Sequence, residues 1–402
     1  MSLSNEQLIE IAKAAITSGS IASSGKMNPQ QADRFIDFVI DITQLKGMAR
    51  VVRVRPEQLD IDKISVGARV AVAKGEGVDP GVRRGVSTSK ISLTPKEIMV
   101  PFEIGDIFKE INLEQDQVEE HIVRMMATQF ANDLEDLYIN GNTLGPARLE
   151  GDLYGGGSST LYIKDAYMGL TNGWLPRVTA GHVLDAENAP IGPNVLSRAI
   201  NEMPDKFRRN RSMMRFFVSP DHEQAYRESV SSRMTQSGDA ALNGQGNLTP
   251  FGIPLVPVPL LSSTPLVVEN SVANTDGTTA TALSYKPIVA GSLVLTATTL
   301  GSVPTAKYIL NTDYSVDEAN GTWTRLGGAI GSGATVKATY QAKGQAILTH
   351  ADNLVLAIGR DIRLERDRNI FKGMNEFALT VRVDVNIEEV DASVFVKNIA
   401  TE

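Results

Sequence analysis

Residues that commonly catalyse reactions or bind metals are sparse in this chain. It has 402 residues and no cysteine, which excludes disulfides, thiolate metal sites and cysteine nucleophiles. The four histidines are scattered, with no two of them three to five residues apart: His121, His182, His222 and His350. No metal-binding motif or catalytic triad emerges from this spacing. The sequence therefore predicts no metal site and no catalytic centre.

One glycine-rich stretch approaches a phosphate-binding loop. A P-loop has four residues between its glycines and a Ser or Thr after its lysine, so that backbone amides wrap the phosphates. Here five residues separate Gly19 from Gly25, and Met27 follows Lys26. No strand pattern precedes this stretch, and the chain has no Gly-x-Ser-x-Gly for a nucleophile elbow. We expect no enzyme activity and no cofactor.

Two groups of charged residues could contact a partner. Arginines interleave with phenylalanines over 207–217, which fits a nucleic-acid contact, but a solvated helix end or an ion pair between subunits is the favoured interpretation. The second group lies on the predicted hairpin and on the closing strands: Arg83, Arg84, Lys90, Arg360, Arg363, Glu365, Arg366 and Asp367. These side chains either cover a solvated β face or form salt bridges between copies of the chain, each contributing about 0–1 kcal/mol. We take them as candidate inter-subunit contacts.

The composition is that of a globular, mildly acidic protein. Hydrophobic residues make up 42% of the chain, charged residues 21%, and the net charge is −8. This length suits two or three compact units of about 100–200 residues each. The negative charge gives no general attraction to nucleic acid or anionic membranes. The N-terminus lacks a signal-peptide pattern and no apolar stretch approaches a membrane span, so we expect folding in a reducing cytosol without membrane contact.

Three extended elements are predicted in the first part of the chain. Residues 1–50 form an arm with helical pieces, because apolar residues recur at helical spacing up to Ala15. Residues 48–108 alternate with period two on either side of a Gly/Pro-rich tip, which predicts a long hairpin. Residues 112–140 carry an apolar stripe and predict a helix about 42 Å long. Because a projecting two-stranded ribbon is only marginally stable alone, the hairpin is expected to rest on a partner.

The second part changes character twice. Residues 193–264 begin with a helix at Pro193 and continue with a buried strand and a second helix, predicting a small α/β domain. Residues 265–343 are rich in Thr, Gly, Ala and Val and predict a small immunoglobulin-like β-sandwich. The strands on either side could run directly into each other, so this β domain is interpreted as an insertion. Residues 344–402 return to long alternating strands.

This order of elements resembles the major capsid protein of tailed bacteriophages, whose type member is the Hong Kong 97 phage. The segment ISLTPKEIMVPFEIGDIFKEINLEQDQVEEHIVRMMATQF looks like the return strand of that family's extended loop followed by its spine helix. FGIPLVPVPLL looks like the strand that leaves the axial domain, and NLVLAIGRDIRLERDRNIFKGMNEFALTVRVDVNIEEVDASVFVKNI looks like the closing peripheral segment. The resemblance covers most of residues 30–270 and 344–400.

The resemblance implies an α+β fold of the Hong Kong 97 type with an inserted all-β sandwich. Its division of the chain is as follows: N-arm 1–50, extended loop and flanking strands 51–108, peripheral domain with spine helix 109–192, axial domain 193–264, inserted immunoglobulin-like domain 265–343, and axial-domain return with peripheral strands 344–402. Relatives carry such insertions as surface knobs, so the inserted domain is expected to face outward.

The function implied is that of a major capsid protein. Copies of the chain would assemble in the host cytoplasm into pentamers and hexamers of an icosahedral head, the virion shell around double-stranded DNA. Expected partners are further copies, a scaffolding protein, a portal and a cement or decoration protein, with only loose, non-specific proximity to DNA and no membrane. Two alternatives stay open: an encapsulin-type bacterial nanocompartment shell, and a binding protein whose inserted domain recognises a host surface or sugar.

Overall fold

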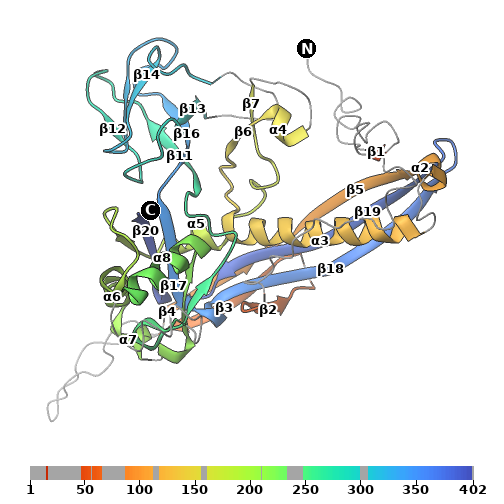
Figure 1. Ribbon diagram of the computed structural model, residues 1–402, viewed down its shortest axis with the longest axis horizontal. Coiled ribbons are helices and arrows are strands. Elements are labelled where there is room, and N and C mark those ends of the chain that lie inside the picture. The colour runs from red at the N-terminus through yellow and green to blue at the C-terminus, as the bar shows by residue number, and fades with distance from the viewer. Residues whose placement is uncertain are drawn as a thin grey trace, which may run out of the picture.

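Figure 1 shows the computed structural model of the protein, which combines a long sheet, a second sheet and a smaller β unit. The structure describes residues 15–16, 47–55, 57–65, 87–111, 117–154, 161–209, 211–232, 248–298 and 307–400. The predicted hairpin tip KGEGVDPGVRRG and almost all of the predicted N-terminal arm lie outside these ranges.

The long sheet has five strands in the order β1-β5-β19-β18-β2. Their bounds are β1 Ala15–Ile16, β5 Lys96–Gly105, β19 Met374–Ile387, β18 Leu354–Asn369 and β2 Arg50–Arg53. The three long strands are antiparallel, and the two short edge strands run parallel to their neighbours. The helical prediction is wrong at Ala15, which pairs with Glu103 of β5, because the edge of a sheet offers unpaired backbone groups to any extended segment.

Helix α3 (Gln117–Asn140) runs along this sheet, as Figure 1 shows. Its apolar stripe, which includes Phe130 and Leu134, is buried together with the alternating apolar residues of β5 and β19. The helix ends at Asn140 as predicted, and Gly141 is required there because a Cβ would lie 2.7 Å from the carbonyl oxygen of Thr171. Residues 112–116 of the predicted helix lie outside the described ranges, and a separate short helix, α2 (Asp106–Ile111), precedes them.

The second sheet also has five strands, in the order β10-β9-β17-β20-β8. Their bounds are β10 Leu255–Pro257, β9 Met214–Val218, β17 Gly344–His350, β20 Ser393–Ile399 and β8 His182–Asp185. The predicted helices are confirmed as α6 (Pro193–Glu202) and α8 (Pro220–Ser231). The closing alternation was wrongly predicted to continue as one segment, because the short 3-10 helix η4 (Val390–Ala392) turns the chain and sends β20 into this second sheet.

Residues 265–343 form a unit of two three-stranded antiparallel sheets, ordered β11-β16-β13 and β12-β15-β14. Their bounds are β11 Leu266–Val272, β16 Thr335–Gln341, β13 Val294–Ala297, β12 Thr281–Ala282, β15 Thr322–Arg325 and β14 Tyr314–Asp317. Trp323 is fully buried in this unit, and its indole N–H donates to the Ser271 hydroxyl at 2.9 Å. The two ends of the unit meet where the Ala342 N–H donates to the Pro265 carbonyl at 2.9 Å. The elements described in this unit are all strands, as predicted, while its immunoglobulin-like topology stays a prediction.

Smaller elements connect these parts. The ribbon pairs β3 (Leu59–Ser65) with β4 (Ser87–Leu93), which confirms the base of the predicted hairpin. The remaining elements are β6 Ala147–Leu149, β7 Tyr162–Lys164, α4 Glu150–Tyr154, α5 Trp174–Val178, α7 Asp205–Arg208, η1 Arg211–Met213, η2 Pro250–Gly252 and η3 Ala351–Asn353.

Candidate assembly surfaces

The outer half of β18 presents a row of exposed side chains. β2 pairs with β18 only from Val355 to Ile358, and no other described strand continues along that edge. Residues 361–368 are consequently exposed, whereas Leu354 and Leu356 are fully buried. An open strand edge is able to accept pairing with another chain, and proteins commonly protect such edges with charged residues. The β18 edge fits both descriptions.

Most of the predicted contact residues already have an ion-pair partner within the chain. Arg366 Nη1 lies 2.8 Å from Glu119 Oε1 on α3, and Arg360 pairs with Glu97 of β5. Arg363 lies 3.5 Å from Glu365 on its own strand. The other predicted contact residues are placed as follows: the Asp367 carboxylate accepts the Arg368 N–H at 2.8 Å, Lys90 pairs with Asp60 at 2.8 Å, and Arg83 and Arg84 lie outside the described residues.

The base of the β3–β4 ribbon is fixed to the long sheet. Leu93 packs in a small buried cluster with Val355 and Ala357 of β18. Hydrogen bonds from Gln58 and then from Lys90 lower the pKa of Asp60 to about 2, so this carboxylate stays charged at any physiological pH. The base of the ribbon is therefore held by apolar packing against β18 and by the ion pair of Lys90 with Asp60.

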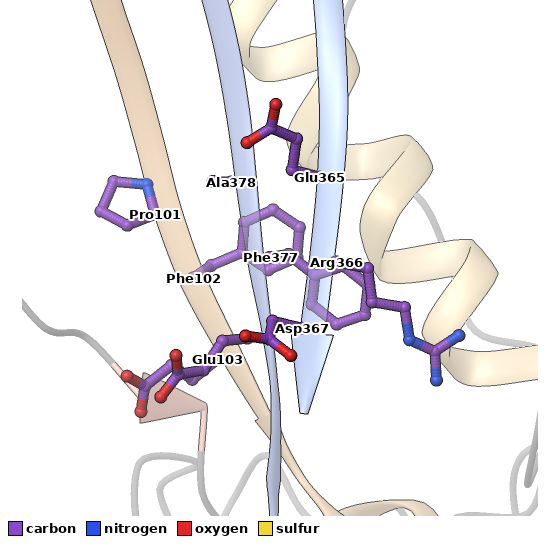
Figure 2. Close-up of a pocket in the computed structure, with 9 residues that line it drawn as sticks. Pro101, Phe102, Glu103, Glu365, Arg366, Asp367, Phe377 and Ala378 are labelled. Carbon is purple, nitrogen blue, oxygen red and sulfur yellow. The ribbon is translucent and has the colours of Figure 1, made fainter. Parts of the chain in front are cut away.

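A recess of about 400 Å³ lies on the long sheet, where β5, β18 and β19 run side by side (Figure 2). The rings of Phe102 and Phe377 stack there with centroids 5.1 Å apart, and the Arg366 guanidinium lies 5.7 Å from the Phe377 ring. Figure 2 shows Arg366 pointing towards the helix, while Glu103 and Asp367 point to the opposite side. At this place the sheet thus has one aromatic face against α3 and one acidic face. Among the described residues, no group of three His, Cys, Asp or Glu side chains could hold a metal ion.

The hairpin between β18 and β19 ends in exposed apolar side chains that sequence reasoning missed. Phe371 is fully exposed, Ile370 is 80% exposed, and Ile107 of α2 is 65% exposed. The turn is well anchored, because the Asp106 N–H donates to the Gly373 carbonyl at 3.0 Å and Gly373 adopts a positive φ of 64°. We call Ile107, Ile370 and Phe371 the apolar tip. Two large apolar residues within a turn were the available signal, since turns are normally polar.

A groove of about 790 Å³ separates the inserted β unit from the body of the molecule. On its floor the Tyr285 ring meets the Phe395 ring edge-on, with centroids 6.5 Å apart. The Lys397 ammonium donates to the Ser284 carbonyl at 2.6 Å. The unit is therefore held to the second sheet by specific contacts, and nothing in the sequence pattern indicated this groove.

The arginine and phenylalanine cluster of residues 207–217 separates into two parts. Phe216 and Phe217 are fully buried on opposite faces of the second sheet, whereas Arg209 and Arg211 are exposed at its margin. The alternation of β9 therefore explains Phe216 and Phe217, while Phe207 of α7 packs partly buried against the core and the two arginines face solvent.

A close pair of serine and histidine, Ser219 and His222, is structural. Ser219 Oγ lies 2.6 Å from His222 Nδ1 and also accepts the His222 backbone N–H at 3.1 Å, which caps α8. Both residues are buried, and burial lowers the pKa of His222. The pair does not open onto either recess described above. Separately, no helix in the described part of the chain is long and apolar enough to span a membrane.

The chain is similar to a curated prophage protein in sequence and to solved capsid structures in fold. No known family model matches the chain. It is 27% identical over 390 residues, 96% of either chain, to YqbE of Bacillus subtilis (strain 168), whose name is that of a prophage capsid protein. Two solved structures share its fold with TM-scores of 0.50: the capsid of a native GTA particle (13% identity, 96% and 100% of the two chains covered) and the capsid of Myoviridae phage XM1 (10% identity, 96% and 99% covered).

These likenesses confirm the fold predicted from the element order. The chain has the α+β, Hong Kong 97-like fold of phage capsid subunits.

Proposed function

We propose that this chain is the major capsid protein of a tailed phage or prophage, and that its copies assemble into the pentamers and hexamers of an icosahedral head around double-stranded DNA. The observation that carries the proposal is the similarity to a prophage capsid protein along nearly the whole of both chains. The chain then resides in the virion and has a structural rather than catalytic role.

Several surfaces of the single subunit support self-assembly. The outer half of β18 has an unpaired edge within the described residues, and the apolar tip exposes side chains that would be stabilised by burial. Burying a phenylalanine or isoleucine side chain contributes about 1.5–3 kcal/mol. We take the apolar tip and the β18 edge as contacts between copies. The same role is proposed for the contact residues predicted from the sequence: Arg83, Arg84, Lys90, Arg360, Arg363, Glu365, Arg366 and Asp367.

We assign the long sheet with α3 to the peripheral domain and the second sheet to the axial domain, with residues 265–343 as an outward knob. The adjacent ends of this unit support the division, because an insertion needs only two neighbouring attachment points on its host. Replacing residues 265–343 by a short Gly-Ser linker is expected to leave both sheets folded, as measured by circular dichroism and urea unfolding. If the shortened chain does not fold, residues 265–343 are instead part of the hydrophobic core of the remaining chain.

Electron microscopy of the expressed chain tests the proposed function. We expect capsomers or closed shells, formed alone or with a co-expressed scaffolding protein; a portal and a cement protein are further expected partners. A strictly monomeric chain at every concentration, also with the scaffold present, would overturn the proposal. Shells that enclose an enzyme cargo instead of DNA would identify the nanocompartment alternative.

A further inference from the structure

Five basic residues gather on the segment that joins α6 to β9 and on the start of β9. We call Lys206, Arg208, Arg209, Arg211 and Arg215 the basic corner. They fall within ten consecutive positions of a chain whose net charge is −8. In Figure 1 this segment, marked by α7, lies at the opposite side of the second sheet from the inserted β unit.

The members of the basic corner differ in how far their charge is neutralised. Arg208 pairs with Asp205, and Lys206 Nζ lies 3.9 Å from Asp391 Oδ2. Arg209 and Arg211 are exposed, and neither has a hydrogen bond or ion pair with any residue in the described part of the chain. Two guanidinium groups are therefore directed at solvent without a carboxylate partner among these residues.

Arg215 adds a third guanidinium group without a carboxylate partner among the described residues, and it is held in place. Its Nη1 donates to the Ser212 carbonyl at 2.6 Å and to the Met214 carbonyl at 2.7 Å. These acceptors are neutral, so they fix the guanidinium without cancelling its charge. Met214 is fully buried in β9, and His350 Nε2 lies 3.3 Å from the Phe207 carbonyl, which ties the segment to the end of β17.

The arginines of β18 provide the contrast. Arg360, Arg363 and Arg366 all have a carboxylate partner within the chain, so their local field is largely cancelled. In the basic corner, three arginines of one sign remain available. Several closely spaced guanidinium groups match the phosphate oxygens of a nucleic-acid backbone. A contact between protein copies normally has an apolar centre instead. Among the described residues of this segment, Met213 is the only large apolar side chain that is exposed.

We propose that the basic corner binds the phosphate backbone of double-stranded DNA without reading its sequence. The inference rests on the proposed function, because that function places DNA inside the shell. Contacts of this kind release counterions, so the logarithm of the binding constant falls with the logarithm of salt concentration by about 0.9 per phosphate contacted. Acidic side chains of a neighbouring copy are the competing occupant.

The test measures binding of the full-length, unassembled chain to a fluorescein-labelled 30-base-pair DNA of random sequence by anisotropy, in 50–300 mM KCl. The variant R209Q/R211Q removes two exposed charges that have no partner among the described residues, so its folding is expected to be intact. The matched control R363Q/R366Q removes the same charge from paired arginines of β18. We expect R209Q/R211Q to bind about tenfold more weakly at the lowest salt and to reduce the salt slope by about two, with less than a twofold change for the control.

Three outcomes would overturn the inference: no measurable binding by the unmodified chain, equal weakening in both variants, or unchanged DNA binding by R209Q/R211Q combined with failed assembly. The last result would assign the basic corner to a neighbouring copy instead. Electron microscopy of the same preparations separates this inference from the proposed function, because intact shells without DNA binding overturn the inference alone.

Discussion

The two five-stranded sheets differ in how much of each a single copy covers. In the second sheet, β17 and β20 are buried along almost their whole length, because α6 packs on β20 and β8 while the inserted unit and its linkers pack on the other face. In the long sheet, burial of β18 stops after Ala357, and residues 361–368 are exposed. The central strands of the second sheet are therefore covered within one chain, whereas residues 361–368 of β18 are exposed in the described structure.

Under the proposed function, this difference separates the residues that fold one copy from those that would join copies. Apolar side chains of the second sheet are already removed from water, so their free energy contributes to folding. At the far end of the long sheet the side chains of the apolar tip are exposed, so the free energy of burying them is available for association. Arg363, Arg366 and Arg368 at the same end already have carboxylate partners. Substitutions in the two regions should consequently affect different measurements.

The largest effect on folding is expected from Phe216→Ala in β9. Phe216 is fully buried, and removing such a ring reduces the free energy of unfolding by about 3–5 kcal/mol. The matched control is Phe371→Ala in the apolar tip, which should change that free energy by less than about 0.5 kcal/mol because the ring is fully exposed. Urea unfolding of the unassembled chain measures both. Similar losses for the two phenylalanines would contradict the proposed separation.

The same tip should dominate association. Phe371→Ser is expected to raise the concentration needed for assembly by about 10- to 100-fold, since loss of one buried aromatic contact is worth about 1.5–3 kcal/mol. Light scattering during assembly gives this concentration, and unfolding of the unassembled chain serves as the control for folding. If the variant assembles at the same concentration as the unmodified chain, the apolar tip does not contribute to the contact between copies.

A third difference concerns pH. Because burial lowers the pKa of His222, the unfolded chain takes up a proton near pH 6.5 that the folded chain does not. Stability is therefore complete above pH 6.5 and declines as pH falls below it, by at most about 1.4 kcal/mol per pH unit from this group. Unfolding at pH 7.5 and 5.5 should show a smaller pH-dependent loss in His222→Gln than in the unmodified chain. An equal loss in both proteins would assign the pH dependence to other groups.

The smallest effect is expected for the ion pair that joins the long sheet to α3. Arg366→Ala should destabilise the chain by about 1 kcal/mol or less, because the Arg366 side chain is 58% exposed although Glu119 is only 15% exposed. Arg363→Ala, whose pair with Glu365 is exposed on both sides, should have no measurable effect on folding. If urea unfolding showed a larger loss of stability for Arg363→Ala than for Arg366→Ala, the pair of Arg363 with Glu365 would be the more stabilising of the two.

Local signals in the sequence predicted much of the element order. Pro193 begins α6, Pro220 begins α8 after the capping Ser219, and Gly321 takes the positive φ of the turn between β14 and β15. These positions were predictable because they depend on backbone conformation and on hydrogen bonds within a few residues. The charged character of the β18 edge was equally visible in the sequence.

What only the tertiary structure decided is which elements lie together and which surfaces remain uncovered. Period-two alternation fits a strand of either sheet, so it could not place β20, and the 3-10 turn before it was invisible to that pattern. Charge alone did not show that Glu119 neutralises Arg366 while Arg209 has no such partner in the described chain, because that depends on the packing of residues distant in sequence. The exposure of Phe371 was likewise decided by the fold: the same residue type is buried at position 216 and left for another molecule to cover at position 371.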